Sequence, residues 1–241
     1  MELANGEVGI TVNGEEKVKY LKKVFDLNVP EEVQTMLQSD RDIPEKIKYA
    51  RKAEIVLAAK IGTAGFEVIG VDEKNLYAYL PTEEKTYHIP VLVNASFYLA
   101  ATRENLHKDS VWNKWLIKQI PVLLVQWIAH LVTTDIGSDA YTILPKKLNS
   151  FDSLAANYNA GLEYAKHYIP FIPNSEGLLL TSTEALLDFS FLSTQAFVGK
   201  IAIINYITQN QRDLLLAENP FPKDLSNTKL RGFGVRSFEW R

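Results

Sequence analysis

Cysteine is absent from the 241 residues of the chain. Its absence excludes disulfide bonds, thiolate nucleophiles and zinc sites with cysteine ligands. Histidine is also scarce, and the four histidines are scattered without the spacing of metal ligands, so we expect surface or capping roles for them and no metal site. Because the N-terminus also lacks a signal-like segment, the sequence favours a reducing, cytoplasmic setting.

Long apolar runs and an excess of one charge are missing too. The most apolar stretch, from Trp112 to Leu131, is interrupted by polar residues such as Lys118 and Gln126, so we interpret it as a core helix and expect no membrane partner. The 26 basic and 29 acidic side chains give a net charge of −3. This mild acidity argues against a chain whose main work is to coat nucleic acid or anionic membranes.

Common nucleotide-binding and catalytic motifs are absent as well. The chain has no phosphate-binding glycine loop with Lys-Ser/Thr, no Gly-x-Gly-x-x-Gly after a strand, and no Gly-x-Ser-x-Gly nucleophile elbow. The simple nucleotide-binding signatures therefore fail, and hydrolases that need such an elbow are rejected. What is present is a globular composition, with 46% apolar and 23% charged residues, which predicts a folded core.

Segments of strand character dominate residues 1–108. We expect a short strand over 8–12, a solvated helix in the lysine-rich run 17–23, and two short helices where Pro30 and Pro44 are each followed by acidic residues. Four strand-like runs follow, over 54–61, 66–71, 75–80 and 89–101. Because their connections are short, the predicted fold class is α+β, with a mainly antiparallel mixed sheet and flanking helices.

From Asp109 onward the hydrophobic period becomes helical. Asp109 or Ser110 can cap a helix whose apolar stripe carries three of the four tryptophans, and we expect Trp112, Trp115 and Trp127 to be buried. Pro121 lies inside this helix and predicts a kink or break. Further helices are predicted over 151–168, 183–187 and 194–217, and a short strand or hairpin arm is predicted over 178–181. The chain thus divides into a sheet-bearing region, 1–108, and a mainly helical region, 109–241.

One ordered set of short motifs indicates a protein family more specifically than the composition does. It comprises Leu80-Pro81-Thr82; Ile89 to Ala95 with Phe97; Ala101-Thr102-Arg103-Glu104; Trp112-Asn113 with Leu116; and, downstream, Ile143 to Pro145, Phe171 to Pro173 with Gly177, and Glu184-Ala185 with Asp188. In order and spacing this set resembles the sacsin and plant No Vein group of Hsp90-like (GHKL) ATPases, especially their bacterial relatives. The resemblance covers about residues 44–188 and implies an Hsp90 transducer- or middle-like fold.

The resemblance implies that the ATP-holding part is missing from this chain. In the family, a domain with Glu-x-x-x-Asn and Asp-x-Gly-x-Gly boxes precedes the Leu-Pro-Thr segment, and the residues before Leu80 carry neither box. The segment Asp135 to Asp139 half-resembles the second box, but Asp139 replaces its second glycine, and we interpret it as a helix-terminating loop. We therefore expect a fragment whose Met1 is not the natural start. It would hold no cofactor itself, while the parent protein would use ATP and Mg²⁺.

Arg103 is the catalytic candidate that follows from the resemblance. Thr102-Arg103-Glu104 resembles the Ser-Arg-Glu of the Hsp90 middle domain, whose arginine reaches the ATP γ-phosphate. A guanidinium suits that role because it stays charged and offers a planar fork of donors to phosphate oxygens. Two positions depart from the family loop, Ala100 in place of Asn and His107 in place of Gln. The alternative is a strand-end arginine paired with Glu104 or Asp109; we expect it solvent-accessible where the strand ends.

Three functions compete at this level. The first is a non-catalytic transducer and middle module of an Hsp90-like ATPase, whose partners would be an N-terminal ATP-binding domain of the same polypeptide and an unknown protein client. The second is a stand-alone scaffold that holds a peptide or protein through the loop Ile169–Pro173. The third, nucleic-acid contact through the basic tail from Lys229 to Arg241, is disfavoured by Glu239 and the negative net charge.

Overall fold

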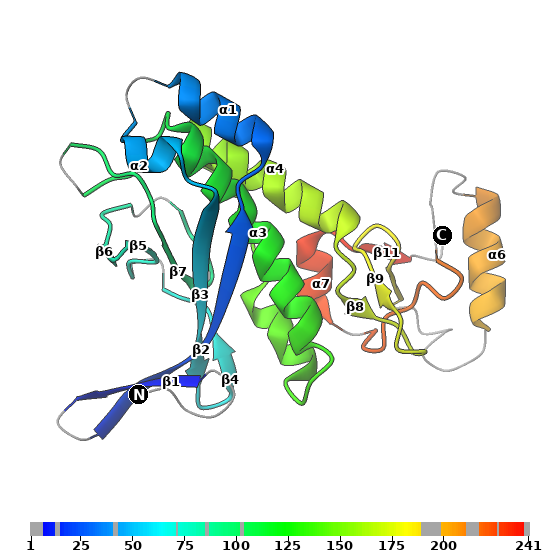
Figure 1. Ribbon diagram of the computed structural model, residues 1–241. Helices are drawn as coiled ribbons and strands as arrows, with labels where there is room; N and C mark the ends of the chain where they lie inside the picture. Colours follow the sequence, from blue (N-terminus) through cyan, green and yellow to red (C-terminus); the bar gives the residue numbers. More distant parts are fainter. Residues whose placement is uncertain are drawn as a thin grey trace. The chain divides into compact units, whose positions relative to one another are not determined.

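The computed structural model describes residues 7–12, 15–40, 43–70, 72–84, 87–101, 104–188, 199–210, 217–225 and 227–238. Helices and strands are mixed along the chain, which confirms the α+β class (Figure 1). The chain forms two compact units: unit 1 comprises residues 1–127 and 142–163, and unit 2 comprises residues 128–141 and 164–241. The boundary expected at residue 108 lies within unit 1 and, as a statement about separate domains, stays a prediction.

A mixed sheet forms the framework of unit 1. Its strands are β1 (Glu7–Val12), β2 (Glu15–Asn28), β3 (Lys52–Gly62), β4 (Gly65–Glu67), β5 (Leu76–Ala78), β6 (Leu80–Pro81) and β7 (Leu92–Ala95). They are ordered β1-β2-β3-β7-β5-β6, with β4 paired to β3. The pairing of β5 with β7 is parallel, whereas the other pairs are antiparallel. The predicted mainly antiparallel mixed sheet is therefore confirmed.

The strand β2 corrects one expectation. The lysine-rich run 17–23 belongs to this long strand and not to a solvated helix. Its residues from Lys19 to Asn28 pair one by one with β3, as the two long strands in Figure 1 show. In β3 every second side chain is buried, from Ala53 to Ala59, so a continuous apolar face is available for the sheet. Pairing with this distant strand outweighs the local helix preference of lysine.

The helices of unit 1 lie close to the positions predicted from the sequence. They are α1 (Glu31–Ser39), α2 (Glu45–Lys48), most of α3 (Val111–Leu131) and most of α4 (Ser153–Tyr168). Both short helices begin directly after Pro30 and Pro44, as predicted. In α3 the three tryptophans are buried, which confirms that expectation. The helix runs without interruption through Pro121, so the predicted break does not occur, while the predicted kink stays a prediction.

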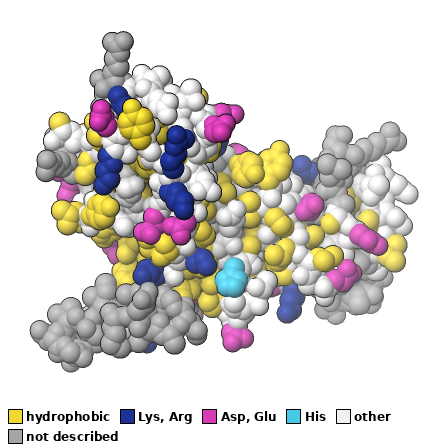
Figure 2. Space-filling model, viewed as in Figure 1, with side chains coloured by type: hydrophobic (Ala, Val, Ile, Leu, Met, Phe, Trp, Pro, Cys, Tyr) yellow, Lys and Arg dark blue, Asp and Glu magenta, His cyan; other side chains and the backbone are white. Residues whose placement is uncertain are grey.

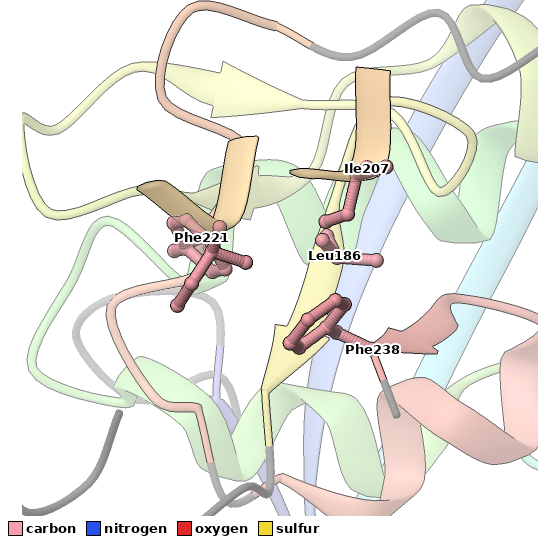
Figure 3. Packing of buried hydrophobic residues seen from close by; sticks show 5 residues of the cluster. Leu186, Ile207, Phe221 and Phe238 are labelled. Atoms are coloured by element: carbon pink, nitrogen blue, oxygen red, sulfur yellow. The ribbon is translucent and has the colours of Figure 1, made fainter. Parts of the chain in front are cut away.

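Unit 2 is built from short elements around a small apolar core. They are the 3-10 helix η2 (Gly137–Ile143), whose residues up to Tyr141 belong here, β8 (Ile172–Pro173), β9 (Leu179–Leu180), β10 (Leu186–Asp188), α6 (Lys200–Asn210), α7 (Thr228–Phe233) and β11 (Arg236–Phe238). Leu186 of β10, Ile207 of α6, Phe221 and Phe238 of β11 pack together with Ile203 (Figure 3). The core thus joins segments that are far apart in sequence.

Two further predictions concern unit 2. The helix predicted over 183–187 is wrong, because residues 186–188 form β10, which pairs in parallel with β11 about fifty residues later in the chain. The helix predicted over 194–217 is confirmed for residues 200–210; residues 199 and 217 are not helical, and 194–198 and 211–216 lie outside the described residues. The hairpin arm predicted over 178–181 is confirmed as β9, which pairs with β8.

Among the helices described, none has the length and apolar character needed to cross a bilayer.

Gly161 marks a close approach between α3 and α4. A Cβ atom at this buried position would lie 2.0 Å from the carbonyl oxygen of Lys118 and 3.1 Å from Cγ of Pro121. The distance of 2.0 Å is far below any van der Waals contact. The Lys118 oxygen belongs to the backbone of α3, so it cannot move away by a side-chain rotation. Only glycine therefore lets the two helices pack at this distance.

We predict that Gly161→Ala destabilises unit 1 by about 2 kcal/mol, because overpacking against a backbone atom costs up to roughly 3 kcal/mol and helix propensity regains only about 1 kcal/mol. Chemical denaturation measures the change. Ala160→Gly, at the exposed neighbouring position of α4, is the control and is expected to cost about 1 kcal/mol through propensity alone. A Gly161→Ala protein as stable as wild type would contradict the close approach.

Candidate functional site

Residues 98–101 and 104–107, within the set of motifs from unit 1, form the two arms of a hairpin, which is called the 98–107 hairpin below. Leu99 and Leu106 form an antiparallel bridge, the Ala100 N–H donates to the Asn105 carbonyl at 2.8 Å, and the His107 N–H donates to the Tyr98 carbonyl at 3.0 Å. The chain therefore reverses between Ala100 and Asn105. Thr102 and Arg103 lie outside the described residues, so the predicted exposure of Arg103 stays a prediction, but the flanking Ala101 and Glu104 are exposed.

Asn113 clamps the two arms of this hairpin to the first turn of α3. Its Oδ1 accepts from the Tyr98 N–H at 2.8 Å, and its Nδ2 donates to the carbonyls of Tyr98 at 2.6 Å and His107 at 3.0 Å. The side chain is 0% exposed. Next to it, the Trp112 indole N–H donates to the Ser96 carbonyl at 2.8 Å. The Trp-Asn motif thus fixes the base of the hairpin on the helix.

The segment after β6 holds the hairpin from the other side. The Glu83 N–H donates to the Glu104 carbonyl at 2.7 Å, and Glu84 Oε1 accepts from the Leu106 N–H at 3.2 Å. The Glu84 side chain is buried at 5% exposure. Thr82 turns this segment back by donating from both its N–H and its hydroxyl to the Leu76 carbonyl, at 2.9 and 3.1 Å. Thr82 of the Leu-Pro-Thr motif therefore orients the segment that bonds to the same hairpin.

Glu84 also belongs to a polar cluster with Lys108, Asp152 and Tyr87. Lys108 Nζ is 3.9 Å from Glu84 Oε2 and 3.3 Å from Asp152 Oδ2, and the Tyr87 hydroxyl donates to the same Asp152 oxygen at 2.7 Å. The other oxygen of Asp152 accepts from the Ala155 N–H at 2.8 Å, as an N-cap of α4. The Lys108 side chain is 44% exposed, so its ion pairs are weak and the hydrogen bonds to Asp152 dominate.

These contacts shift two pKa values. Burial by itself raises the pKa of Asp152, but the N–H of Ala155, the hydroxyls of Tyr87 and Ser150, and the charge of Lys108 outweigh it and lower the pKa to about 2. Burial and the hydrogen bond to Asp152 raise the pKa of Tyr87 above its ordinary value. Asp152 is therefore a carboxylate, and Tyr87 a neutral donor, throughout the physiological range.

His107 completes the base of the hairpin. Its ring stacks on Tyr98 at a centroid distance of 5.3 Å with an interplanar angle of 12°, and its Nδ1 is buried without a hydrogen-bond partner. In the described part of the chain, no group of three or more His, Asp or Glu side chains gathers as a metal site would require. What the described contacts supply is a hydrogen-bonded support for the two arms of the hairpin.

The other segments singled out from the sequence lie elsewhere. Residues 135–139 form the end of a loop and the start of η2, with Gly137 at a φ of +55°. In the loop Ile169–Pro173, Phe171 and Ile172 are fully buried, which leaves Pro170 as its exposed residue. Of the basic tail, Lys229, Arg231 and Arg236 are exposed on α7 and β11, and Arg241 lies outside the described residues.

Several residues of the site were missed from the sequence. Asp152 carried a usable signal, because it directly precedes a helical apolar period and so fits the N-cap preference. Glu84 and Lys108 carried none, since their roles come from contacts with residues 22 and 44 positions away in sequence.

On the face shown in Figure 2, acidic and basic side chains are interspersed with hydrophobic ones over unit 1. This mixed surface gives that face no extended patch of a single charge, so its electrostatics do not favour a polyanion there.

Comparison with known proteins gives one partial similarity. Protein NO VEIN of Arabidopsis thaliana is 34% identical to this chain over 53 residues, which is 22% of this chain and 2% of that protein. The chain therefore spans a very small part of the protein it matches. A scan of protein-family models matches none of them, and no solved structure matches the chain.

We predict that Asp152→Asn destabilises the protein by about 1–2 kcal/mol at pH 7, because the buried Tyr87 hydroxyl and the Lys108 ammonium lose their charged acceptor. The pKa in the folded protein, about 2, is below the ordinary value of 3.8, so this contribution is complete above roughly pH 4 and is lost as the pH falls through 2. Urea denaturation at several pH values should show the difference between wild type and variant shrink on acidification.

Asp109→Asn is the matched control. This exposed carboxylate lies 3.8 Å from Lys114 Nζ, so its removal should change stability by less than about 0.5 kcal/mol. If the Asp152 variant differed from wild type by a constant amount between pH 7 and pH 2, the lowered pKa would be wrong.

Proposed function

We propose that this chain is the transducer and middle module of an Hsp90-like ATPase. In this proposal Arg103 contacts the γ-phosphate of ATP that is held by a separate N-terminal domain, and the chain couples the nucleotide state to rearrangement or to binding of a protein client. The observation that carries the proposal is the clamped 98–107 hairpin, whose loop contains Thr102 and Arg103 and is flanked by exposed residues.

Motif residues of unit 1 support the proposal, because several of them bond to this hairpin or to the segments that hold it. Thr82 turns the segment that bonds to Glu104, Asn94 of β7 accepts from the Tyr79 N–H at 3.1 Å, and Trp112 with Asn113 anchors the hairpin base. A set of short motifs that merely filled a core would not gather around one loop. The partial similarity to Protein NO VEIN points toward the same family.

The chemistry of the proposal needs only one group from this chain. A guanidinium that reaches the transferring phosphoryl group stabilises the charge on its oxygens in the transition state. The stabilisation depends on placement, and a hairpin fixed by Asn113 and Glu84 supplies a rigid base for it. ATP and Mg²⁺ would be bound by the partner domain.

Coupling follows from the same contacts. Because Asn113 belongs to the first turn of α3, a displacement of the loop toward a bound nucleotide would be passed to that helix through the amide. The Glu104 carbonyl bonds to the Glu83 N–H, so the displacement would also reach the strand pair β5–β6. The nucleotide state would thereby act on both the sheet and the helical layer of unit 1.

We predict that Arg103→Ala, in the polypeptide that also contains the ATP-binding domain, lowers kcat for ATP hydrolysis by about 10²- to 10³-fold and leaves ATP affinity unchanged. Arg103→Lys should recover only part of this loss, since an ammonium keeps the charge without the planar fork. The isolated chain should show no calorimetric ATP binding tighter than millimolar.

Arg51→Ala is the matched control, because Arg51 is an exposed arginine of unit 1 that directly precedes β3 and is not part of the hairpin. It should leave turnover at the wild-type level. Wild-type turnover in Arg103→Ala would remove the proposed role of the arginine, and tight ATP binding by the isolated chain would remove the division of labour between the domains.

A further inference from the structure

Strand β1 covers only part of the outer edge of β2. It pairs with β2 as far as Leu21, which lies opposite Glu7, the first residue of β1. On the other side of β2, the pairing with β3 continues to Asn28. Among the described residues, no strand or loop backbone bonds to the outer side of residues 22–28. We call these residues the open edge; they form the upper part of the blue strand β2 in Figure 1, and the proposed function does not use them.

The open edge is a regular template for another strand. Its sequence, Lys-Lys-Val-Phe-Asp-Leu-Asn, contains neither proline nor glycine. Each of its residues pairs with one residue of β3 without a bulge, whereas the register shift of β2 lies in its pairing with β1. An exposed strand edge presents a row of N–H and C=O groups, which the backbone of an added strand can satisfy. The open edge is therefore suited to strand addition.

The side chains of the open edge offer apolar surface on both faces of the sheet. Phe25 and Leu27 lie opposite buried residues of β3 and are themselves only half-buried. On the other face, Val24 is 41% exposed. An added strand would remove part of this apolar surface from water, which favours association.

The charges of the open edge restrict how it can pair with the same edge of a second copy. Residues that lie opposite each other in an antiparallel pair point to the same face of the sheet, so the two-fold axis must pass between two identical residues. An axis at Lys22, Lys23 or Asp26 would place like charges directly opposite each other, which is unfavourable.

The length of the open edge restricts the pairing further. An axis at Val24 would bring Leu27 of the second copy beside Leu21, and Glu7 of β1 occupies that position. An axis at Phe25, the middle residue of the open edge, lets the whole edge of both copies pair without meeting β1. Each charged residue of the edge then lies opposite an uncharged one.

We propose that the open edge of β2 pairs antiparallel with the same edge of a second copy of this chain, with Phe25 opposite Phe25 at the two-fold axis. Aromatic pairs across strands are favourable, and Lys22 of each copy lies diagonally to Asp26 of the other, within reach of a long side chain. Such short strands bury less than a standard-size interface, so we expect a weak dimer. This inference is independent of the proposed ATPase role, because the open edge contains neither Arg103 nor any residue of the 98–107 hairpin.

Sedimentation equilibrium of the whole chain, from about 10 to 500 µM, tests for the dimer, and we expect a reversible monomer–dimer equilibrium in this range. Because the chain has no cysteine, a single introduced cysteine carries a unique nitroxide label. Lys22→Cys and Asn28→Cys lie equally far from Phe25, so both labels should give a distance of about 20 Å between the copies by double electron–electron resonance. An axis at Val24 would instead give about 13 and 27 Å.

Val24 provides a charge test at an exposed position. Val24→Asp places a carboxylate opposite Asp26 of the second copy and should weaken the dimer about tenfold. Val24→Lys places an ammonium opposite the same carboxylate and should strengthen the dimer.

Val68→Asp is the matched control, since Val68 is also an exposed valine of unit 1 and lies outside β2. It should leave dimerisation unchanged. A chain that is monomeric at about 500 µM overturns the proposal and leaves the open edge to a strand of another protein. Label distances that differ by more than about 5 Å, or Val24→Asp and Val24→Lys variants that change the dimer in the same direction, also overturn it. Circular dichroism and thermal unfolding check that each variant is folded.

Discussion

Asn113 is wholly removed from water, and its one amide group meets three backbone groups that belong to the two arms of the 98–107 hairpin. A buried amide without partners would cost several kcal/mol, so this residue is tolerated only while the hairpin is in place. The reverse also holds, because Tyr98 and His107 would lose their buried partners if the amide were absent. The positions of the two hairpin arms depend on this mutual requirement.

The rest of unit 1 is arranged around that contact in layers. Glu84 and the backbone of Glu83 tie the outer arm of the hairpin to the segment after β6, and Asp152 ties Tyr87 and Lys108 to the start of α4. The close approach at Gly161 then brings α4 against α3, the helix that bears Asn113. Hydrogen bonds and ion pairs thus connect the hairpin to the segment after β6 and the residues around Lys108 to the start of α4. The support of the hairpin arms therefore involves several elements of unit 1.

Unit 2 obeys a different constraint. Its elements are two to eleven residues long, and none of them buries enough apolar surface alone. Leu186, Ile207, Phe221 and Phe238 must therefore come from four separate segments to form one core. The same gathering of distant segments produces a cavity of about 850 Å³, where a turn between two short strands and a loop before α7 are bonded to each other through Asn174 and Pro173.

The sequence by itself determined the elements whose stability is local: the helices after Pro30 and Pro44, the buried tryptophan face of α3, and α4 with its periodic apolar positions. It also singled out the motifs that surround the hairpin, although not the contacts that unite them. Tertiary structure decided β2 and β10, whose strand character comes from partners elsewhere in the chain, β3 and β11. It alone placed Glu84, Lys108 and Asp152 together and opened the cavity beside Tyr141, because hydrogen bonds between distant residues leave no periodic trace in a sequence.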